Sequence, residues 1–288
     1  MNAYLLNRLI KGGRYKKVML ERLTEPLHLN FLSLFVAIFG SYGTKVAWDL
    51  VTRQQYAFPL LWAARHAKEL GYKRISAVEF GVAQGNGLLN MCALAQRTTA
   101  FTGVEIDVYG FDTGAGMPPP IDYRDIPEFF QTGDFPMQDP AELRARLPAN
   151  ARLIIGDIAE TVKGFVENLS TEAPLGFVSV DVDYYSSTVP CLGILEGDAR
   201  KFLPMFPIYF DDLGIDAVNP WNGEALAINE FNAAQEMRKI APFTYLRAKR
   251  IFKNPQWIEA MYMAHFHDHP LRSADQTRGF AKSGLESW

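Results

Sequence analysis

The chain has 288 residues, of which 48% are hydrophobic and 21% charged, and its formal net charge is −3. This composition is typical of a globular protein with a full core, and neither the charge nor any run of Lys and Arg favours nucleic acid as a partner. Cys92 and Cys191 stand in apolar, helix-like contexts, so we expect buried free thiols in a cytoplasmic protein rather than a disulfide framework or a zinc site.

The first 57 residues are expected to form a helical extension that covers a substrate pocket or pairs two subunits, which makes a homo-oligomer the expected state. Residues 1–23 hold six basic residues and the single acid Glu21 among apolar residues, so a weak association with a membrane surface is an alternative to a solvated helix face. The longest apolar run, residues 31–39, is too short to span a bilayer, and stable membrane insertion is not expected.

The next part of the chain alternates between strand and helix patterns. A helix over residues 58–70 ends at Gly71, and strands are then expected at 75–80, 104–112, 151–157, 177–181 and 207–212. Helical segments lie between these strands, and this alternation predicts an α/β fold with a mostly parallel sheet and helices on both faces.

The C-terminal part is expected to complete this sheet. Residues 223–240 carry the apolar spacing of one helix, and residues 243–252 and 257–267 alternate like the two strands of an antiparallel hairpin. The main domain is therefore predicted over residues 58–270, with residues 113–145 as a lid insertion and residues 271–288 as a tail.

A glycine-rich turn follows the first predicted strand. Every second position from 79 to 87 belongs to its pattern, namely Glu79, Gly81, Ala83, Gly85 and Gly87. Glycine lets the backbone approach a ligand closely, and the following helix presents free N–H groups, so the turn favours a nucleotide-like ligand. A tight turn without a ligand is the alternative, because a glycine pattern alone is a weak signal.

Acidic residues follow the next strands along the chain. Asp112, with Glu105 and Asp107 as weaker alternatives, could accept the hydroxyls of a ribose, and Asp157 could hold an adenine amine. The alternative for each is an ordinary surface carboxylate.

Two acidic pairs end the fourth and fifth predicted strands. Asp181 and Asp183 follow one apolar run, and Asp211 and Asp212 follow the other. Because the carboxyl ends of neighbouring parallel strands lie side by side, the four carboxylates are expected to meet and to bind a hard divalent cation.

These segments carry a family resemblance. VEFGVAQGNG, YGFDTGAGMPPP, TGDFPM with ELRARL, GDIAETV, SVDVDYYSST and IYFDDLG resemble, in this order, the motifs of class I S-adenosylmethionine-dependent methyltransferases. Within that class they most resemble the macrocin O-methyltransferase-like group, which modifies sugar hydroxyls. The resemblance covers about residues 75–265 and implies a Rossmann-like fold with a seven-stranded sheet that ends in an antiparallel hairpin.

The resemblance also implies a donor site and a metal site. The donor, S-adenosylmethionine, is expected to contact Glu79, Gly81, Val82, Ala83, Gly85, Asp112, Thr113, Gly156, Asp157 and Asp181. Magnesium or another hard divalent cation is expected at Asp211 and Asp212 together with Asp181 or Asp183, a choice that the sequence leaves open. The remaining one of these two acids, or His267 in the last strand, is the expected general base.

Two departures from the family pattern bear on the prediction. Ala83 replaces the usual central glycine, which is acceptable if its backbone keeps a negative φ. Tyr184 and Tyr185 stand where related catechol enzymes usually have a lysine base, so a small sugar or glycoside is the expected acceptor. Trp221 and Glu224, in the loop after the fifth strand, are further candidates for contact with this acceptor.

Three other functions remain open at this point. A metal-dependent glycosyltransferase would use Asp181 and Asp183 as an Asp-x-Asp pair, although this leaves Asp211 and Asp212 without a role. A nicotinamide dehydrogenase would explain the glycines but not the four strand-end acids. A non-catalytic assembly protein would explain the apolar N-terminal helices, but not why acids are present in every expected motif.

Overall fold

A computed structural model of the chain describes residues 20–273 and contains one mixed sheet. Its seven strands are β1 (Arg74–Phe80), β2 (Glu105–Asp112), β3 (Ala151–Ile155), β4 (Leu175–Val180), β5 (Met205–Phe210), β6 (Arg238–Pro242) and β7 (Met261–Phe266). They are ordered β3-β2-β1-β4-β5-β7-β6, and only β7 runs antiparallel to its neighbours. This is the strand order of the class I methyltransferase fold, which confirms the fold predicted from the sequence.

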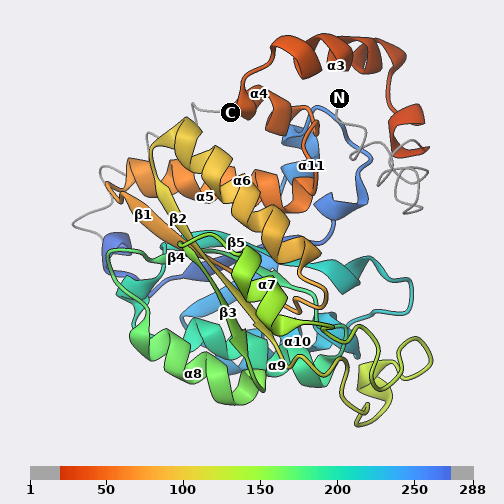
Figure 1. Ribbon diagram of the computed structural model, residues 1–288, viewed down its shortest axis with the longest axis vertical. Coiled ribbons are helices and arrows are strands. Elements are labelled where there is room, and N and C mark those ends of the chain that lie inside the picture. The colour runs from red at the N-terminus through yellow and green to blue at the C-terminus, as the bar shows by residue number, and fades with distance from the viewer. Residues whose placement is uncertain (1–19, 274–288) are drawn as a thin grey trace.

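Helices cover both faces of the sheet, and Figure 1 shows α5 and α6 on one side with α8, α9 and α10 on the other. The α-helices are α3 (Leu27–Phe39), α4 (Tyr42–Ala47), α5 (Gln54–Glu69), α6 (Asn86–Thr102), α7 (Pro140–Arg146), α8 (Ile158–Asn168), α9 (Tyr185–Leu192), α10 (Gly223–Ala234) and α11 (Leu246–Lys249). Short 3₁₀ helices span Tyr123–Asp125, Gly193–Glu196, Ala199–Lys201, Asp211–Gly214, Gln256–Ile258 and Pro270–Arg272.

The core lies on both faces of the central strands. Every residue of β4 is buried, and β1 is buried except for Arg74, as expected for parallel strands that are covered on both sides. On the α5 side, Tyr56 and Leu60 are fully buried, while Val162 and Val166 of α8 are buried against the other face. Cys92 and Cys191 are buried and free, as predicted.

The C-terminal prediction needs two corrections. The helix expected over residues 223–240 ends at Ala234, and its last residues form β6, because the Asn232 side chain exchanges hydrogen bonds with the backbone N–H and C=O of Ile240. The hairpin partner of β7 is therefore β6 and not residues 243–252, which contain α11. The alternation of apolar and polar residues over 243–252 did not distinguish this connection from a strand.

The predicted domain boundaries also shift. Helix α5 begins at Gln54, so a boundary after residue 57 would cut through it, and α7 begins at Pro140 within the predicted insertion. The irregular part of the insertion thus spans residues 113–139. Within residues 20–273, no helix is long and apolar enough to cross a membrane. The predicted surface association falls largely on residues 1–19 and the predicted tail largely on residues 274–288, outside the described residues.

Buried hydrogen bonds fix the insertion to the sheet side of the molecule. Asp125 is fully buried and accepts hydrogen bonds from the backbone N–H groups of Ile121 and Ser186 and from the Ser186 hydroxyl, at 2.8 Å each. Phe130 packs edge-on against the buried ring of Tyr184. The insertion is therefore held against the start of α9, next to the carboxyl end of β4.

Candidate active site

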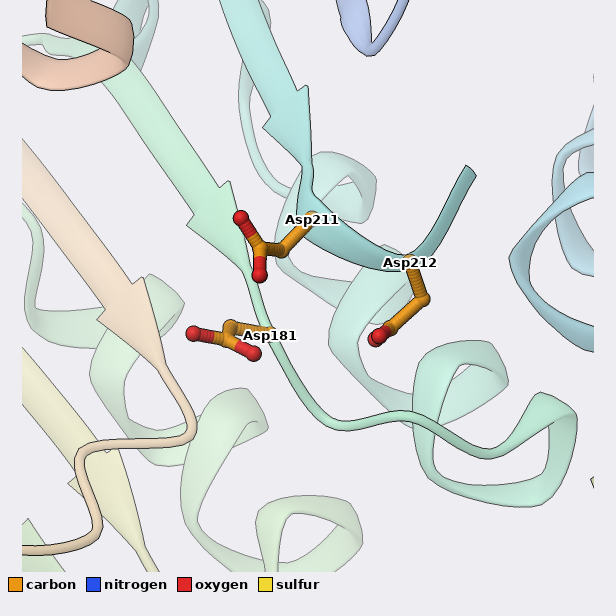
Figure 2. A group of neighbouring side chains, drawn as sticks. All are labelled: Asp181, Asp211 and Asp212. Carbon is orange, nitrogen blue, oxygen red and sulfur yellow. The ribbon is translucent and has the colours of Figure 1, made fainter. Parts of the chain in front are cut away.

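Three carboxylates meet beyond the carboxyl ends of β4 and β5. Asp181 follows β4 directly, and Asp211 and Asp212 follow β5, because the parallel pairing of Val180 with Phe210 brings the two strand ends level. Each residue offers an oxygen atom, and these three oxygen atoms lie within 4.8 Å of one another (Figure 2). Oxygen ligands at this spacing suit a hard divalent cation.

Asp183 lies beside this cluster but is not part of it. Its backbone is left-handed, with φ +61°, and its N–H donates a 3.0 Å hydrogen bond to Oδ2 of Asp212. Asp183 lines the same cavity as the other three acids. Of the two possibilities that the sequence left open, the geometry favours Asp181 as the fourth-strand ligand and leaves the Asp183 carboxylate for another role.

Two of the three acids of this cluster, Asp181 and Asp212, are held where ionisation is unfavourable. Burial, followed by repulsion from Asp211 and Asp212, raises the pKa of Asp181 well above its usual range. Burial, followed by repulsion from Asp183 and Asp211, raises the pKa of Asp212 in the same way. A bound cation would remove this repulsion, so the cluster has the electrostatic character of a cation site rather than of a set of paired surface acids.

Two buried side chains, Tyr209 and Glu224, contact residues of the cluster. The sequence did not indicate Tyr209 as a site residue, and it indicated a different contact for Glu224. The Tyr209 hydroxyl in β5 donates a 2.7 Å hydrogen bond to Oδ1 of Asp211. Glu224, in the first turn of α10, accepts a hydrogen bond from the Asp212 N–H, and its other oxygen has no partner among residues 20–273. Glu224 is fully buried, so the expected contact with an acceptor is corrected to a role beneath the cluster. Trp221 is exposed and does not line the cavity.

The glycine turn packs directly against the start of the acidic segment. Gly81 has φ +83°, and a Cβ atom at this position would lie 1.6 Å from the carbonyl oxygen of Asp181. Gly81 is thus required where the turns after β1 and β4 touch. Ala83 has φ +46°, so the condition of a negative φ is not met, and the non-glycine residue holds a left-handed conformation that costs about 1–2 kcal/mol.

Asp112 stabilises this conformation. Its Oδ2 accepts hydrogen bonds of 2.8 Å from the N–H groups of both Val82 and Ala83, and its Oδ1 accepts one of 2.6 Å from Gly114. The carboxylate that was expected to bind a ribose is therefore also the group that orders the glycine turn. It also lines the cavity.

Glu79 lies behind the glycine turn and not in the cavity. It is almost fully buried, accepts a 2.7 Å hydrogen bond from the Tyr56 hydroxyl, and has its pKa raised to about 7 by burial. Its Oε1 lies so close to Gly87 that a Cβ atom there would approach it to 1.9 Å. Tyr56 comes from α5, for which the sequence predicted no site residue, and it precedes the helix that was expected over residues 58–70.

One cavity of about 350 Å³ joins these groups. Its predicted lining residues are Gly81, Ala83, Asp112, Thr113, Asp181, Asp183, Asp211 and Asp212. Met117, Asp134 and Phe135 of the insertion also line it, and the sequence analysis did not identify them as site residues. The volume lies in the range of small-molecule sites.

Five residues of the predicted donor set do not line the cavity, namely Glu79, Val82, Gly85, Gly156 and Asp157. Asp157 is exposed and caps α8 by accepting a hydrogen bond from the Ala159 N–H. Gly85 begins α6 with φ +80°, and a Cβ atom there would meet the Leu143 side chain of α7 at 2.3 Å. A larger residue at position 85 would thus have to shift the Leu143 side chain, in addition to any effect on a ligand.

His267 lies at the wrong edge of the sheet to be the general base. Strand β7 runs antiparallel to β5, and His265 pairs with Met205 at the start of β5, whereas Asp211 follows the end of β5. The exposed His267 therefore lies beyond the amino edge of the parallel strands. The direction of β7 argues against the predicted catalytic role of this residue.

Comparison with known proteins gives likeness of fold only. No family model matches the sequence, and no curated protein matches it significantly. The solved calicheamicin methyltransferase CalS11 is 20% identical, with a TM-score of 0.47 over 72% of this chain and 84% of that one. An O-methyltransferase from Bacillus cereus in complex with SAH is 14% identical, with a TM-score of 0.40 over 75% of this chain and 82% of that one.

A third structure is MycE methyltransferase from the mycinamycin pathway, solved with Mg, SAH and mycinamycin VI. It is 11% identical, with a TM-score of 0.37, over 78% of this chain and 50% of that one. At such identities and scores these structures do not decide what this chain binds or which reaction it catalyses.

Proposed function

We propose that the protein transfers a methyl group from S-adenosylmethionine to a hydroxyl of a small sugar or glycoside, with a divalent cation such as Mg²⁺ at its acidic cluster. The observation that carries the proposal is one cavity that joins the glycine turn after β1 to the three carboxylates after β4 and β5. Donor and cation sites that share a cavity can align two substrates for direct displacement.

The residues present fit both absent groups. Gly81 and Asp112 shape a turn whose backbone lies open to the cavity, and the oxygens of the acid cluster have the spacing that a cation requires. When bound, S-adenosylmethionine would supply an electrophilic methyl carbon, and the cation would lower the pKa of the acceptor hydroxyl.

The four acids divide into two roles in this proposal. Asp181, Asp211 and Asp212 hold the cation. Asp183, whose pKa is raised to about 6 by burial and then by repulsion from Asp211, is ionised at neutral pH and accepts the hydroxyl proton as general base. Its backbone bond to Asp212 keeps the base at a fixed position relative to the cation site.

The cavity chemistry favours a sugar-like diol as acceptor. No lysine is among the residues that line the cavity in the described part of the chain, and Tyr184, which stands near the position of a catechol enzyme's lysine, is buried against Phe130. Carboxylates and the polar Ser187 and Thr113 offer hydrogen-bond acceptors and donors to several hydroxyls at once.

The glycosyltransferase alternative is less well supported by this geometry. An Asp-x-Asp site requires Asp181 and Asp183 to serve the metal as a pair, but Asp183 is not among the three acids whose oxygen atoms lie within 4.8 Å of one another. The cation ligands instead come from two different strands.

Calorimetric titration with S-adenosylmethionine and S-adenosylhomocysteine tests the donor directly, with a nicotinamide dinucleotide and a nucleotide sugar as controls. We expect both sulfur compounds to bind and both controls to fail. Binding of only a control would remove the methyltransferase proposal. A panel of sugar and glycoside acceptors, assayed with Mg²⁺ and with a chelator, then tests the acceptor class.

A further inference from the structure

The two acids that follow β5 each have one carboxylate oxygen engaged by a donor of the protein. The Tyr209 hydroxyl donates a 2.7 Å hydrogen bond to Oδ1 of Asp211. The backbone N–H of Asp183 donates a 3.0 Å hydrogen bond to Oδ2 of Asp212. Because a hydrogen bond occupies a lone pair that a cation would otherwise use, the other oxygen of each acid is the better ligand.

The Tyr209 hydroxyl is held in place by the packing of its ring. Tyr209 is 5% exposed, and its ring lies edge-on to that of Tyr56 in α5, with 6.5 Å between the ring centroids. The Asp211 side chain is exposed, and within residues 20–273 its carboxylate accepts no hydrogen bond besides that of Tyr209. The packed ring therefore fixes the hydroxyl, and the hydroxyl fixes the rotation of the Asp211 carboxylate.

These hydrogen bonds limit how many oxygens the two acids can give to one cation. Mg²⁺ takes about six ligands in a near-ideal octahedron and keeps several waters, whereas Ca²⁺ takes roughly six to eight oxygens and often both oxygens of one carboxylate. Acids that each offer a single well-placed oxygen therefore suit Mg²⁺ better than Ca²⁺. The smaller cation also lies closer to an acceptor oxygen and lowers the pKa of its hydroxyl more.

We propose that Tyr209 is a positioning residue that makes the acid cluster prefer Mg²⁺ to Ca²⁺, because it limits Asp211 to one ligand oxygen. The inference rests on the cation site of the proposed function and adds a cause for the choice of cation. Loss of the hydroxyl frees Oδ1 of Asp211 to bind a larger cation together with Oδ2. It also removes the partner that orients this carboxylate for a small one.

Calorimetric titration of the metal-free full chain with Mg²⁺ and with Ca²⁺ tests this preference without an activity assay. The wild-type chain should bind Mg²⁺ more tightly. In Tyr209→Phe, which keeps the buried ring, the Mg²⁺ affinity should fall roughly tenfold, while the Ca²⁺ affinity should not fall. A general weakening of the fold would lower both affinities together, so the ratio of the two reports the role of the hydroxyl.

Tyr262→Phe is the matched control. Tyr262 pairs with Ile208 and packs edge-on against Phe210, so it lies beside the same segment of β5 but on the face opposite to Tyr209. The same loss of a hydroxyl at this position should leave the ratio of the Mg²⁺ and Ca²⁺ affinities unchanged. A ratio that falls equally in both variants would contradict a specific role for Tyr209.

The titrations separate a failure of the cation site from a failure of this inference. A wild-type chain that binds neither cation would overturn the cation site, and the inference with it. A chain that binds Mg²⁺ and Ca²⁺ with the same ratio before and after Tyr209→Phe would keep the cation site but overturn the role of Tyr209.

A count of bound waters tests the number of ligand oxygens directly. The luminescence lifetimes of bound Tb³⁺, a probe of Ca²⁺ sites, in H₂O and in D₂O give the number of coordinated waters. Tyr209→Phe should lose about one water relative to the wild-type chain, because Oδ1 of Asp211 takes its place. Equal numbers of waters in the two chains would contradict the proposal.

Discussion

The polar residues at the two edges of the sheet differ in their electrostatic surroundings and in their backbone strain. At the carboxyl edge, the pKa values of the half-buried Asp181 and the buried Asp212 are raised, and Ala83 and Asp183 hold left-handed conformations around a cavity. At the amino edge, the histidine His267 is exposed beside Arg272. Buried like charges and strained backbone are stored at functional sites, whereas exposed histidines carry no such cost. Strand direction, which a motif does not show, decides which edge a residue reaches.

The largest effect on activity is expected when an acid at the carboxyl edge is substituted, and a histidine at the amino edge provides the control. Asp181→Asn removes one charge from the cation site and should lower kcat/KM for methyl transfer roughly a hundredfold or more, while His267→Gln should stay within about twofold. Initial rates at saturating donor measure both. An inactive His267→Gln variant that still binds donor and cation would return this histidine to the mechanism.

A pH dependence of stability should follow from the buried carboxyls. The folded pKa of Glu79 is raised to about 7 and that of Asp183 to about 6, above their values in an unfolded chain. The folded state then binds more protons, so its stability is full below about pH 4 and falls as the pH rises to about 7, by roughly 3 kcal/mol for Glu79 alone.

Urea unfolding of the metal-free protein at pH 5 and pH 8 measures this slope. The buried His66, whose pKa burial lowers to about 4, changes the stability in the opposite direction over this range, so the slope is compared with that of the Glu79→Gln variant. The fall in stability from pH 5 to pH 8 should be smaller in this variant by about 2–3 kcal/mol, and an unchanged slope would contradict the prediction.

Divalent cation should stabilise the protein through the acid cluster. Binding to the folded state alone adds about 2.7 kcal/mol at a hundred times Kd, or several degrees in Tm. Thermal melting with Mg²⁺ and with a chelator measures it, and Asp211→Asn should reduce the shift. A shift that persists in this variant would place the cation elsewhere.

A smaller effect is expected behind the glycine turn. Tyr56→Phe removes the hydroxyl that donates to Glu79 and should cost about 1–3 kcal/mol, more at pH 8, where Glu79 is ionised, than at pH 5.5. Tyr72→Phe, at a half-buried position on the same side of the sheet, is the control. Equal losses at both pH values would show that the contribution of this hydroxyl does not depend on the charge of Glu79.

Much of the sheet could be predicted because its five parallel strands are apolar runs separated by helices of clear period. The acid cluster could be predicted from one rule, that parallel strand ends meet at one edge. The roles of Asp181 and Asp183 could not be separated, because the separation depends on one left-handed backbone angle. The β6 strand was missed because it is five residues long and is defined by its pairing with β7 and by Asn232, which no local pattern reveals.

Site residues from distant segments were also beyond the sequence. Tyr56 was not predicted, because it is a single polar residue of a largely apolar helix. Glu224 was named from the sequence as a contact for the acceptor, but it is buried and accepts a hydrogen bond from the Asp212 N–H instead. Glu79 was expected to contact the donor, but it is buried behind the glycine turn. Its position depends on the path of the turn, which brings Gly87 against its carboxylate. Such contacts arise from packing between elements, and local periodicity does not encode them.

The anchoring of Asp125 has a consequence for how molecules reach the cavity. By binding the start of α9, Asp125 divides the segment between β2 and α7 into two short loops, and each can close at a lower entropic cost than one long loop. Met117 lies on the first loop, and Asp134 and Phe135 lie on the second. Backbone hydrogen bonds also join Met117 of the first loop to Gly133 and Asp134 of the second. The two loops should therefore move together, so that a molecule enters or leaves the cavity only when both are displaced.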